Sequence, residues 1–466
     1  DQRINDRGVP MDVDLAESAI EIWDKEKAVL HDTLAELTGL TKVTRGPFLA
    51  WLETNTGVAL DNLRKDYLAA KLKKGDLPEA AAETIGLWAQ KEGKATSKYT
   101  AVVNGTREDG RARGMFQYKG AARTDRVGGR LIQLQNLKRP IEGDTPLQID
   151  NVVGAIKTCD PGMIRMMYPH SVSEVLGGSI RHVIRATEGK IMAVCDLTSI
   201  ESVILGWVAM CPSIDETFRN GRDSYRMFAS KYYNIEYDEV TKAQRSFSKP
   251  PVLGCGFMLG WKGLIAYAEG YGVDMTQDQA KNAVDTFRNM YPEIPAFWKW
   301  IDAAAKYTTQ TGLPCEGYRL TVERDNDFLR IWLPSGRALS YYLPEVQRRE
   351  APWSTPEKVR LIDNFTYMGM NDKNQWVRIS AHAGGLTENI VQSLAGDILW
   401  SGLTKADAAG LPIILHVHDE IGAEVDTLTG MDSLATLQRC MTEKPDWCKD
   451  MWLGADGFLT RRYTKD

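Results

Sequence analysis

The sequence contains no apolar run long enough to span a membrane and no secretory leader. These absences predict a cytoplasmic protein, in the host cytoplasm if a virus encodes it, with no membrane partner. The seven cysteines are scattered, and the closest pair, Cys440 and Cys448, has a spacing that fits no zinc knuckle. We therefore expect reduced thiols rather than a disulfide framework or a structural zinc site.

The chain also lacks a strong excess of charge, because its net charge is only −5. Any surface for nucleic acid must therefore be local. There is no internal repeat, low-complexity tract or long linker, and 466 residues suggest about two to four domains. The glycine-rich stretch at 254–260 is not a Walker A loop, because no Gly-Lys-Ser/Thr follows it.

The stretch from 411 to 425 carries the strongest chemical signal. Two apolar runs with strand periodicity flank His418, Asp419 and Glu420. This pattern predicts a strand, a tight turn and a second strand, with two carboxylates at the tip. Unpaired charge beside apolar walls is costly, and a divalent cation would remove that cost. A plain hairpin with a polar turn is the alternative.

A second carboxylate follows another apolar run. Residues 191–195 lead into Asp196, and a helical pattern begins soon afterwards. Thr198 and Glu201 have the spacing of a capping box for that helix. Carboxylates at a strand end and at a hairpin tip could share two metal ions that clamp the oxygens of a phosphoryl transfer. Spacing alone does not prove that Asp196 and Asp419 meet.

Two further stretches are basic. Arg245 and Lys249 are four residues apart, so on a helix both point the same way and suit a triphosphate, although such pairs are often simply solvated. Residues 109–139 are rich in cations and amides, which can contact phosphates and base edges, or form a basic surface loop. From residue 119 onward only Asp125 opposes the cations, which are Lys119, Arg123, Arg126, Arg130, Lys138 and Arg139.

These motifs occur in the order of motifs A, B and C of family A DNA polymerases. They are Asp-Leu-Thr-Ser-Ile-Glu at 196–201, Arg245 with Lys249 and the glycine-rich run to Gly260, and His418-Asp419-Glu420. The chain resembles the polymerase portion of that family over nearly its whole length, most closely the phage-encoded members. An upstream exonuclease domain, usual in the family, would be missing from this chain.

The resemblance implies an α+β right-hand polymerase fold, with an antiparallel palm sheet, helical fingers and a helical thumb. It assigns 1–150 to the thumb and primer–template grip, 208–325 to the fingers, and 151–207 with 326–466 to the palm. It also implies two Mg²⁺ ions, which Mn²⁺ can replace, held by Asp196, Asp419 and the Leu197 carbonyl.

Further residue roles follow from the same resemblance. Asp196, Asp419, Lys249 and Glu420 would be catalytic, and Glu201 would crowd the sugar 2′ position and exclude ribonucleotides. The residues expected to bind the nucleotide are Arg245, Lys249, Glu201, Tyr225, Phe257 and Leu253. Those expected to bind DNA are Arg126, Arg130, Gln133, Gln135, Asn136, Glu388, Gln392 and His418. His418 would shape the hairpin turn, or alternatively be a buried neutral histidine.

Several positions depart from the family pattern. Val203 stands where the family usually has arginine, Leu253 where it has an aromatic residue, and Phe257-Met258 where it has Tyr-Gly. Pro250 and Pro251 follow Lys249, so we expect the helix to restart at Pro250.

Two elements nearer the C-terminus are also expected. Apolar residues at helical spacing predict an amphipathic helix, namely Leu386, Ile390, Leu394 and Ile398. Residues 426–466 are expected to form a helix and a tail, with Trp447 and Trp452 packed.

The sequence therefore predicts a monomeric, template-directed DNA polymerase that adds deoxynucleotides to a primer 3′ end during replication. Its partners would be primer–template DNA, dNTPs and other replication proteins. A single-subunit RNA polymerase is one alternative, against which Glu201 argues. A degenerate polymerase that binds primed DNA as a scaffold is another. A two-metal nuclease does not explain the motif around Arg245 and Lys249.

Overall fold

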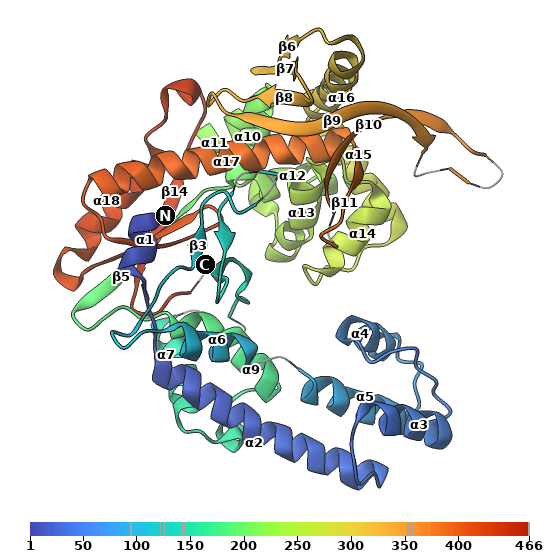
Figure 1. Ribbon diagram of the computed structural model, residues 1–466, viewed down its shortest axis with the longest axis vertical. Helices are drawn as coiled ribbons and strands as arrows, with labels where there is room; N and C mark the ends of the chain where they lie inside the picture. Colours follow the sequence, from blue (N-terminus) through green and yellow to red (C-terminus); the bar gives the residue numbers. More distant parts are fainter. Residues whose placement is uncertain are drawn as a thin grey trace.

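The computed structural model describes residues 1–93, 96–121, 123–124, 126–140, 145–351, 354–355, 358–371 and 373–464, without the side chain of Asp66. Helices and antiparallel sheets combine into a central region from which two limbs extend to the same side (Figure 1). The lower limb consists of α2–α5, and the upper limb is built from α12–α16. Within the described ranges, no helix is both long and apolar enough to cross a bilayer.

The central sheet has four antiparallel strands in the order β12-β13-β5-β14. They are β5 (Lys190–Leu197), β12 (Ile413–Val417), β13 (Glu420–Asp426) and β14 (Ala455–Thr460). The predicted hairpin is thus confirmed. The expectation of a helix and a tail for 426–466 is incomplete, because α18 (Gly430–Thr442) is followed by β14, which pairs with the open edge of β5. Trp447 and Trp452 do pack against the core.

The lower limb has a small core of its own. Its helices are α2 (Val13–Thr38), α3 (Arg45–Thr56), α4 (Lys65–Lys74) and α5 (Glu79–Lys91). Phe48 stacks on Trp88 with ring centroids 4.4 Å apart, inside a cluster separate from the main core. Helix α2 joins the two cores, because Leu15 lies in the main core and Leu34 in the smaller one.

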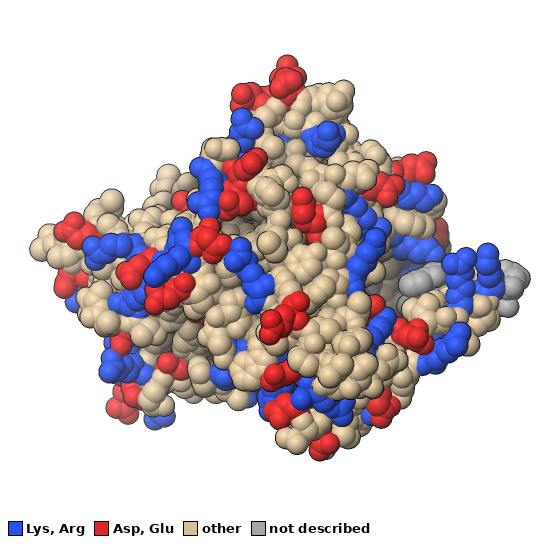
Figure 2. All heavy atoms as spheres, turned by 90° about the horizontal axis from the view of Figure 1, so that it is seen from above, with Lys and Arg blue, Asp and Glu red and all other residues tan. Residues whose placement is uncertain are grey.

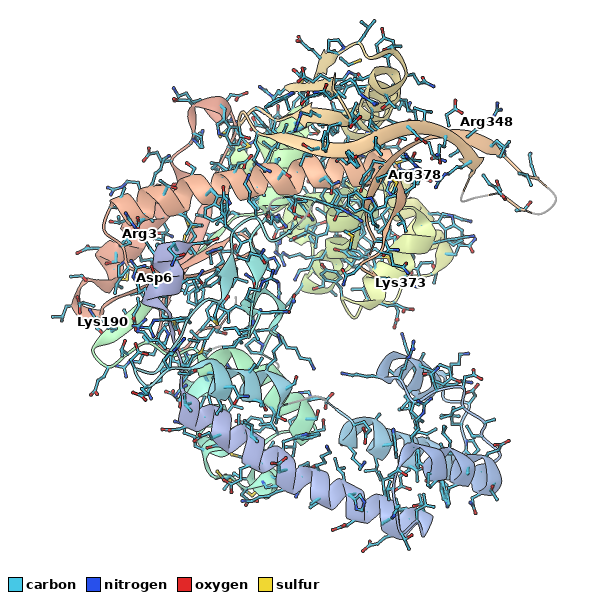
Figure 3. The ribbon with its side chains drawn as sticks, viewed as in Figure 1. Arg3, Asp6, Lys190, Arg348, Lys373 and Arg378 are labelled. Atoms are coloured by element: carbon cyan, nitrogen blue, oxygen red, sulfur yellow. The ribbon has the colours of Figure 1, made fainter. Side chains whose placement is uncertain are left out.

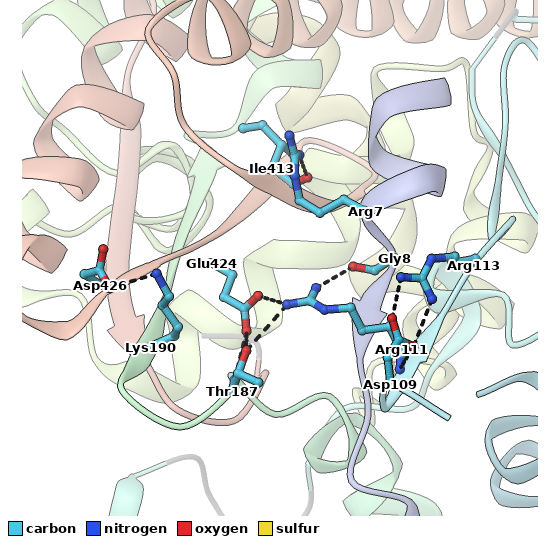
Figure 4. Close-up of polar contacts among 10 residues, drawn as sticks. All are labelled: Arg7, Gly8, Asp109, Arg111, Arg113, Thr187, Lys190, Ile413, Glu424 and Asp426. Carbon is cyan, nitrogen blue, oxygen red and sulfur yellow. Dashed lines mark hydrogen bonds and ion pairs between the residues drawn. The ribbon is translucent and has the colours of Figure 1, made fainter. Parts of the chain in front are cut away.

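The first residues of the chain and the segment from 97 to 129 form short elements beside the central sheet. The short elements here are α1 (Gln2–Arg7), β1 (Val9–Pro10), α6 (Ser97–Gly105), β2 (Arg111–Ala112), β3 (Phe116–Gln117) and β4 (Gly128–Gly129). Arg7 donates a hydrogen bond to the Ile413 carbonyl, and Arg111 forms an ion pair with Glu424 of β13 (Figure 4). Because Thr187 also donates to Glu424, with its backbone N–H at 2.8 Å, this carboxylate joins three segments that are distant in sequence.

Helices α7 (Pro146–Lys157), α8 (Pro161–Met167) and α9 (Val172–Ser179) lead to β5. After β5 come α10 (Ile200–Val208), α11 (Pro212–Arg219), α12 (Ser224–Tyr233), α13 (Lys242–Cys255), α14 (Trp261–Glu269), α15 (Gln277–Met290) and α16 (Glu293–Thr311). The predicted restart at Pro250 is wrong, because α13 contains both prolines. A proline ring accepts helical φ, and the cost is the missing N–H donors to the carbonyls one turn earlier.

A second sheet has six antiparallel strands in the order β11-β10-β9-β8-β7-β6. They are β6 (Cys315–Gly317), β7 (Leu320–Asp325), β8 (Phe328–Trp332), β9 (Ala338–Glu350), β10 (Leu361–Met370) and β11 (Trp376–Ala381). Helix α16 packs on one face. Strands β9 and β10 continue past the sheet as an arm, at the right of Figure 1.

The long helix α17 (Ala383–Ala408) follows β11. The predicted apolar stripe is confirmed, since Leu386, Ile390 and Leu394 are fully buried and Ile398 is nearly so. A single stripe was too narrow an expectation, because residues on other faces such as Val391 and Leu403 are buried as well. The reason is that α17 is enclosed by α10, α16, α18 and β12.

Candidate active site

Backbone pairing brings the two carboxylate motifs together. Strands β5 and β13 pair so that Asp196 lies directly opposite Glu420. The backbone N–H of Leu197 donates a hydrogen bond to the carbonyl of Asp419 at 3.1 Å. The end of β5 and the tip of the β12–β13 hairpin therefore form one site, which the spacing of the motifs could not establish.

The hairpin turn is tight, and His418 adopts a left-handed backbone conformation with φ 58°. Its side chain is exposed, and Nε2 donates to the carbonyl of Gln135 at 3.2 Å. The alternative of a buried neutral histidine is therefore wrong for His418. It applies instead to His416, which stacks on Phe116 at 4.7 Å and whose pKa burial lowers to about 3.

Acidic groups surround the end of β5. Burial raises the pKa of the Cys195 thiol to about 12, and the negative charges of Asp196, Asp456 and Glu420 act in the same direction. Asp456 lies directly opposite Asp196 on β14 and accepts a hydrogen bond from the Thr198 hydroxyl at 3.0 Å. Sequence reasoning missed Asp456, because a single aspartate in a short strand carries no motif.

The donors at this site fit a hard cation. The predicted ligands are the carboxylates of Asp196 and Asp419 and the backbone carbonyl of Leu197, whose N–H bonds the Asp419 carbonyl. Across the parts of the chain that the structure describes, no group of three or more His, Cys, Asp or Glu side chains is arranged as a metal cage. Mg²⁺ commonly binds through one or two carboxylates, with waters and substrate phosphates completing its shell, so this donor set suits it.

The capping box predicted for Thr198 and Glu201 does not form. Ser199, rather than Thr198, is the N-cap residue of α10, with φ 48° and no side-chain cap bond. The Thr198 hydroxyl bonds Asp456 instead, and Glu201 accepts a hydrogen bond from Arg126 at 3.2 Å. Because Glu201 does not cap α10, its carboxylate pairs with a residue of the basic stretch at 109–139.

Most of the predicted DNA-binding residues line one groove of about 420 Å³ between the basic stretch, α17 and the hairpin tip. The predicted residues among its lining are Arg126, Arg130, Gln133, Gln135, Asn136, Gln392 and His418. Glu388 lies one turn from Gln392 and accepts a hydrogen bond from it at 3.1 Å. Arg126 also donates to the Gln392 carbonyl at 3.2 Å, so it joins this groove to Glu201. Asp125 lies outside the described residues.

Four of the six predicted nucleotide-binding residues lie on α12 and α13, whereas Glu201 lies on α10 and Phe257 follows α13. Arg245 forms an ion pair with Asp223 at 2.6 Å, and its guanidinium lies over the Tyr225 ring at 5.2 Å. Asp223 also caps α12, because it accepts hydrogen bonds from two backbone N–H groups of that helix. Lys249 is half-buried one turn further along α13. Within the described lining of the groove, none of the predicted nucleotide-binding residues appears.

Leu253 and Phe257 occupy the end of α13 and the turn after it. Phe257 packs closely against α17, because a Cβ added at Gly384 would lie 2.2 Å from the Phe257 carbonyl oxygen. Sequence reasoning missed Tyr267, which packs on Gly254. Burial raises the pKa of Tyr267, and the hydrogen-bonded Tyr271 adds to the effect.

Comparison with known proteins places these features in a family. The sequence model of "DNA polymerase family A" matches residues 82–321. The DNA polymerase of Bacillus phage SP02 is 30% identical over 470 residues, which cover 100% of this chain and 70% of that protein. DNA polymerase I of Aquifex aeolicus is 28% identical over 149 residues, which cover 32% of this chain and 25% of that protein.

The fold resembles a solved structure described as the POL domain of Pol1 from M. smegmatis in complex with DNA primer-template and dNTP. The TM-score is 0.64, at 17% sequence identity, and the match covers 98% of this chain and 67% of that chain. At this level of identity the likeness concerns the fold, which confirms the predicted α+β right-hand architecture.

Proposed function

We infer, from the premise that this chain belongs to DNA polymerase family A, that it extends a primer 3′ end by two-metal nucleotidyl transfer during DNA replication. Family membership carries the enzyme class, a DNA-directed DNA polymerase. The observation that supports the finer mechanism is the hydrogen bond from Leu197 N–H to the Asp419 carbonyl, together with the pairing of Asp196 with Glu420.

In this proposal Asp196, Asp419 and the carbonyl oxygen of Leu197 hold the metal ions. Two bound Mg²⁺ ions, or Mn²⁺ in their place, would lower the pKa of the primer 3′-hydroxyl and neutralise charge on the triphosphate. Glu420 supports the site from the neighbouring position. It is 1% exposed, and its contact with Tyr463 fixes its orientation.

Arg245 and Lys249 supply fixed positive charge for the incoming triphosphate. The ion pair with Asp223 and the ring of Tyr225 hold the Arg245 guanidinium in place before substrate arrives. Lys249 would donate a proton to the leaving pyrophosphate. Leu253 and Phe257 then contact the base, and Glu201 crowds the sugar 2′ position.

The groove between the basic stretch and α17 receives the primer terminus. Arg126 and Arg130 position phosphates, while the amide side chains of the groove reach base edges from the minor-groove side. The amides are Gln133, Gln135, Asn136 and Gln392. His418 ties the hairpin tip to this groove through the Gln135 carbonyl, and Glu388 orients Gln392.

Domain roles follow from this arrangement as a proposal. Residues 1–150 would be the thumb and grip, 208–325 the fingers, and 151–207 with 326–466 the palm. The boundary at 325/326 falls between β7 and β8 of the six-stranded sheet. That sheet therefore physically joins the proposed fingers to the second part of the palm.

Primer extension on a templated hairpin tests the proposal. The wild-type chain should add the template-matched dNTP with Mg²⁺ and stop when the metal is chelated. Asp419→Asn should abolish extension while hairpin binding remains. Asp432→Asn, in the first turn of α18, is the matched control and should extend normally.

Two outcomes would overturn parts of this proposal. Extension by Asp419→Asn at the wild-type rate would remove Asp419 from the metal site. Addition of rNTPs at the rate of dNTPs would favour the RNA polymerase alternative and remove the proposed role of Glu201. A chain that binds the primed hairpin but never extends it would be the scaffold alternative.

A further inference from the structure

The six-stranded sheet has one face that α16 leaves uncovered. Pairing shows which side chains share it, because residues directly opposite each other on antiparallel strands project to the same face. Phe328 lies opposite Tyr342, Tyr342 opposite Met368, and Met368 opposite Arg378. Trp376 is two residues before Arg378 and therefore lies on this face as well. Leu329 and the other buried residues of β8 point the other way, toward α16.

Three aromatic rings form a row across this face, which we call the aromatic row: Phe328, Tyr342 and Trp376. The ring centroids of Phe328 and Tyr342 are 5.1 Å apart, and those of Tyr342 and Trp376 are 6.2 Å apart. Trp376 is 57% exposed, while the other two rings are half-buried. A sheet face with aligned, accessible rings is a surface on which successive unpaired bases can stack.

Charge on the face is unevenly distributed. The β6–β7 side is acidic, and its carboxylates are Glu316, Glu323 and Asp325. The β8–β11 side carries four arginines against one carboxylate, Glu345. The arginines are Arg330, Arg349, Arg378 and, by strand alternation just before β10, Arg360. Arg330 is paired with Asp325 at 2.5 Å and Arg378 with Glu345 at 2.9 Å. Arg349 and Arg360 therefore carry most of the attraction of a phosphodiester backbone to β8–β11.

Cations also continue outward along the arm and inward toward the proposed DNA groove. Lys and Arg side chains gather on the arm, at the right of Figure 2. At the opposite end, Lys373 lies in the β10–β11 loop on the side nearest the lower limb (Figure 3). Arg123 of the basic stretch donates to the Met370 carbonyl at 3.3 Å, so the end of β10 contacts the stretch that lines the groove.

We propose that the β8–β11 half of this face binds the unpaired 5′ template strand ahead of the primer terminus, with bases stacked on the aromatic row and phosphates held by the neighbouring arginines. The inference rests on the proposed function only for the source of the single strand. The contacts are sequence-tolerant, because every base has a face that can stack on a ring. They would keep the template extended before each base reaches the active site.

Binding measurements with two substrates test this. Fluorescence anisotropy would compare a primed duplex carrying a 5′ template overhang of thymidines with the same duplex made blunt. Wild-type protein should bind the overhang substrate more tightly. A Trp376→Ala/Tyr342→Ala variant should lose affinity for the overhang substrate by on the order of 5- to 100-fold, and should bind the blunt duplex as before.

Matched variants separate stacking from structural damage. Trp332→Ala removes another exposed tryptophan of the same face, whose indole N–H donates to Glu323 on the acidic side at 2.6 Å, and should leave the affinity unchanged. Trp376→Phe keeps a ring and should retain most of the affinity. Arg349→Gln/Arg360→Gln should reduce the salt dependence of overhang binding.

An iododeoxyuridine placed in the overhang should crosslink to peptides that contain Trp376 or Tyr342. Unchanged overhang affinity in the Trp376→Ala/Tyr342→Ala variant, or crosslinks confined to other elements, would overturn the proposal. Asp419→Asn should keep overhang binding while losing extension, so failure of the proposed catalytic site and failure of this surface give different results.

Discussion

The hydroxyl of Tyr463 donates a hydrogen bond to Oε1 of Glu420 at 2.5 Å, and both side chains are buried. The guanidinium of Arg181 lies 5.3 Å from the centre of the same tyrosine ring. Arg181 in turn donates to the backbone carbonyls of Leu137 and Lys138, just after the groove residue Asn136. One buried tyrosine thus joins the carboxylate beside Asp419 to the end of the basic stretch.

Tyr463→Phe should destabilise the protein by about 1.5–3 kcal/mol, because a hydrogen bond to a buried charged group is lost without a replacement donor. It should also lower kcat for primer extension more than it raises the KM for dNTP, since Glu420 would lose its fixed orientation. Urea unfolding and steady-state extension measure the two effects.

Tyr307→Phe is the matched control, because Tyr307 is 45% exposed on α16. It should change neither the unfolding free energy nor kcat. If Tyr463→Phe loses stability but keeps wild-type kcat, the tyrosine has only a structural role.

Local patterns in the sequence predicted the elements that carry the site. A continuous apolar run indicated the strand that ends near Asp196, alternating apolar residues gave the strands around Asp419, and helical spacing gave α17. These signals work because the side chains repeat with the period of the element that buries them. Strand β14 escaped prediction, since its residues include Asp456 and Gly457 and it forms only because β5 offers an unpaired edge.

Contacts between distant segments could not be predicted in the same way. Nothing near Glu201 in the sequence indicates that Arg126 is its partner, because their meeting depends on how the basic stretch packs against α10 and α17. The continuation of α13 through Pro250 and Pro251 could not be predicted from local sequence either. Helix propensity argues against prolines inside a helix, and the burial of both side chains outweighs that preference.

Glu201→Ala should raise the rate of rNTP addition relative to dNTP addition by at least about 10-fold, because removing the carboxylate opens space at the sugar 2′ position. Single-turnover extension with each nucleotide measures the ratio. Glu216→Ala, an exposed glutamate on α11, is the control and should leave the ratio unchanged. An unchanged ratio in Glu201→Ala would mean that Glu201 serves only as the partner of Arg126.

Arg130→Ala should weaken binding to primed DNA in a salt-dependent manner. Arg130 is exposed at the edge of the groove, so its loss should remove about one phosphate contact and reduce the slope of log Kd against log salt by about 1. Lys449→Ala removes an exposed cation that is paired with Asp446 at 2.7 Å and should leave the slope as it is. Parallel salt dependences for Arg130→Ala and wild type would place the phosphates elsewhere.

The last prediction concerns acid stability and follows from His182, which is 1% exposed. Burial lowers its pKa to about 4, and the nearby positive charges of Arg462 and Arg181 act in the same direction, against the hydrogen bond to the Tyr463 carbonyl. The imidazole is therefore neutral in the folded protein, whereas in the unfolded chain it titrates near its ordinary pKa of about 6.5.

Between those two values the unfolded chain binds the extra proton, so the free energy of unfolding must fall as the pH falls from about 6.5 toward 4. At pH 5 the loss from this one group is about 2 kcal/mol. Urea unfolding at pH 7 and pH 5 should show that wild type loses about that much more than His182→Gln, which cannot titrate in this range. His31→Gln changes an exposed histidine and should follow wild type. Equal losses in wild type and His182→Gln would mean that the pKa of His182 is not lowered by folding.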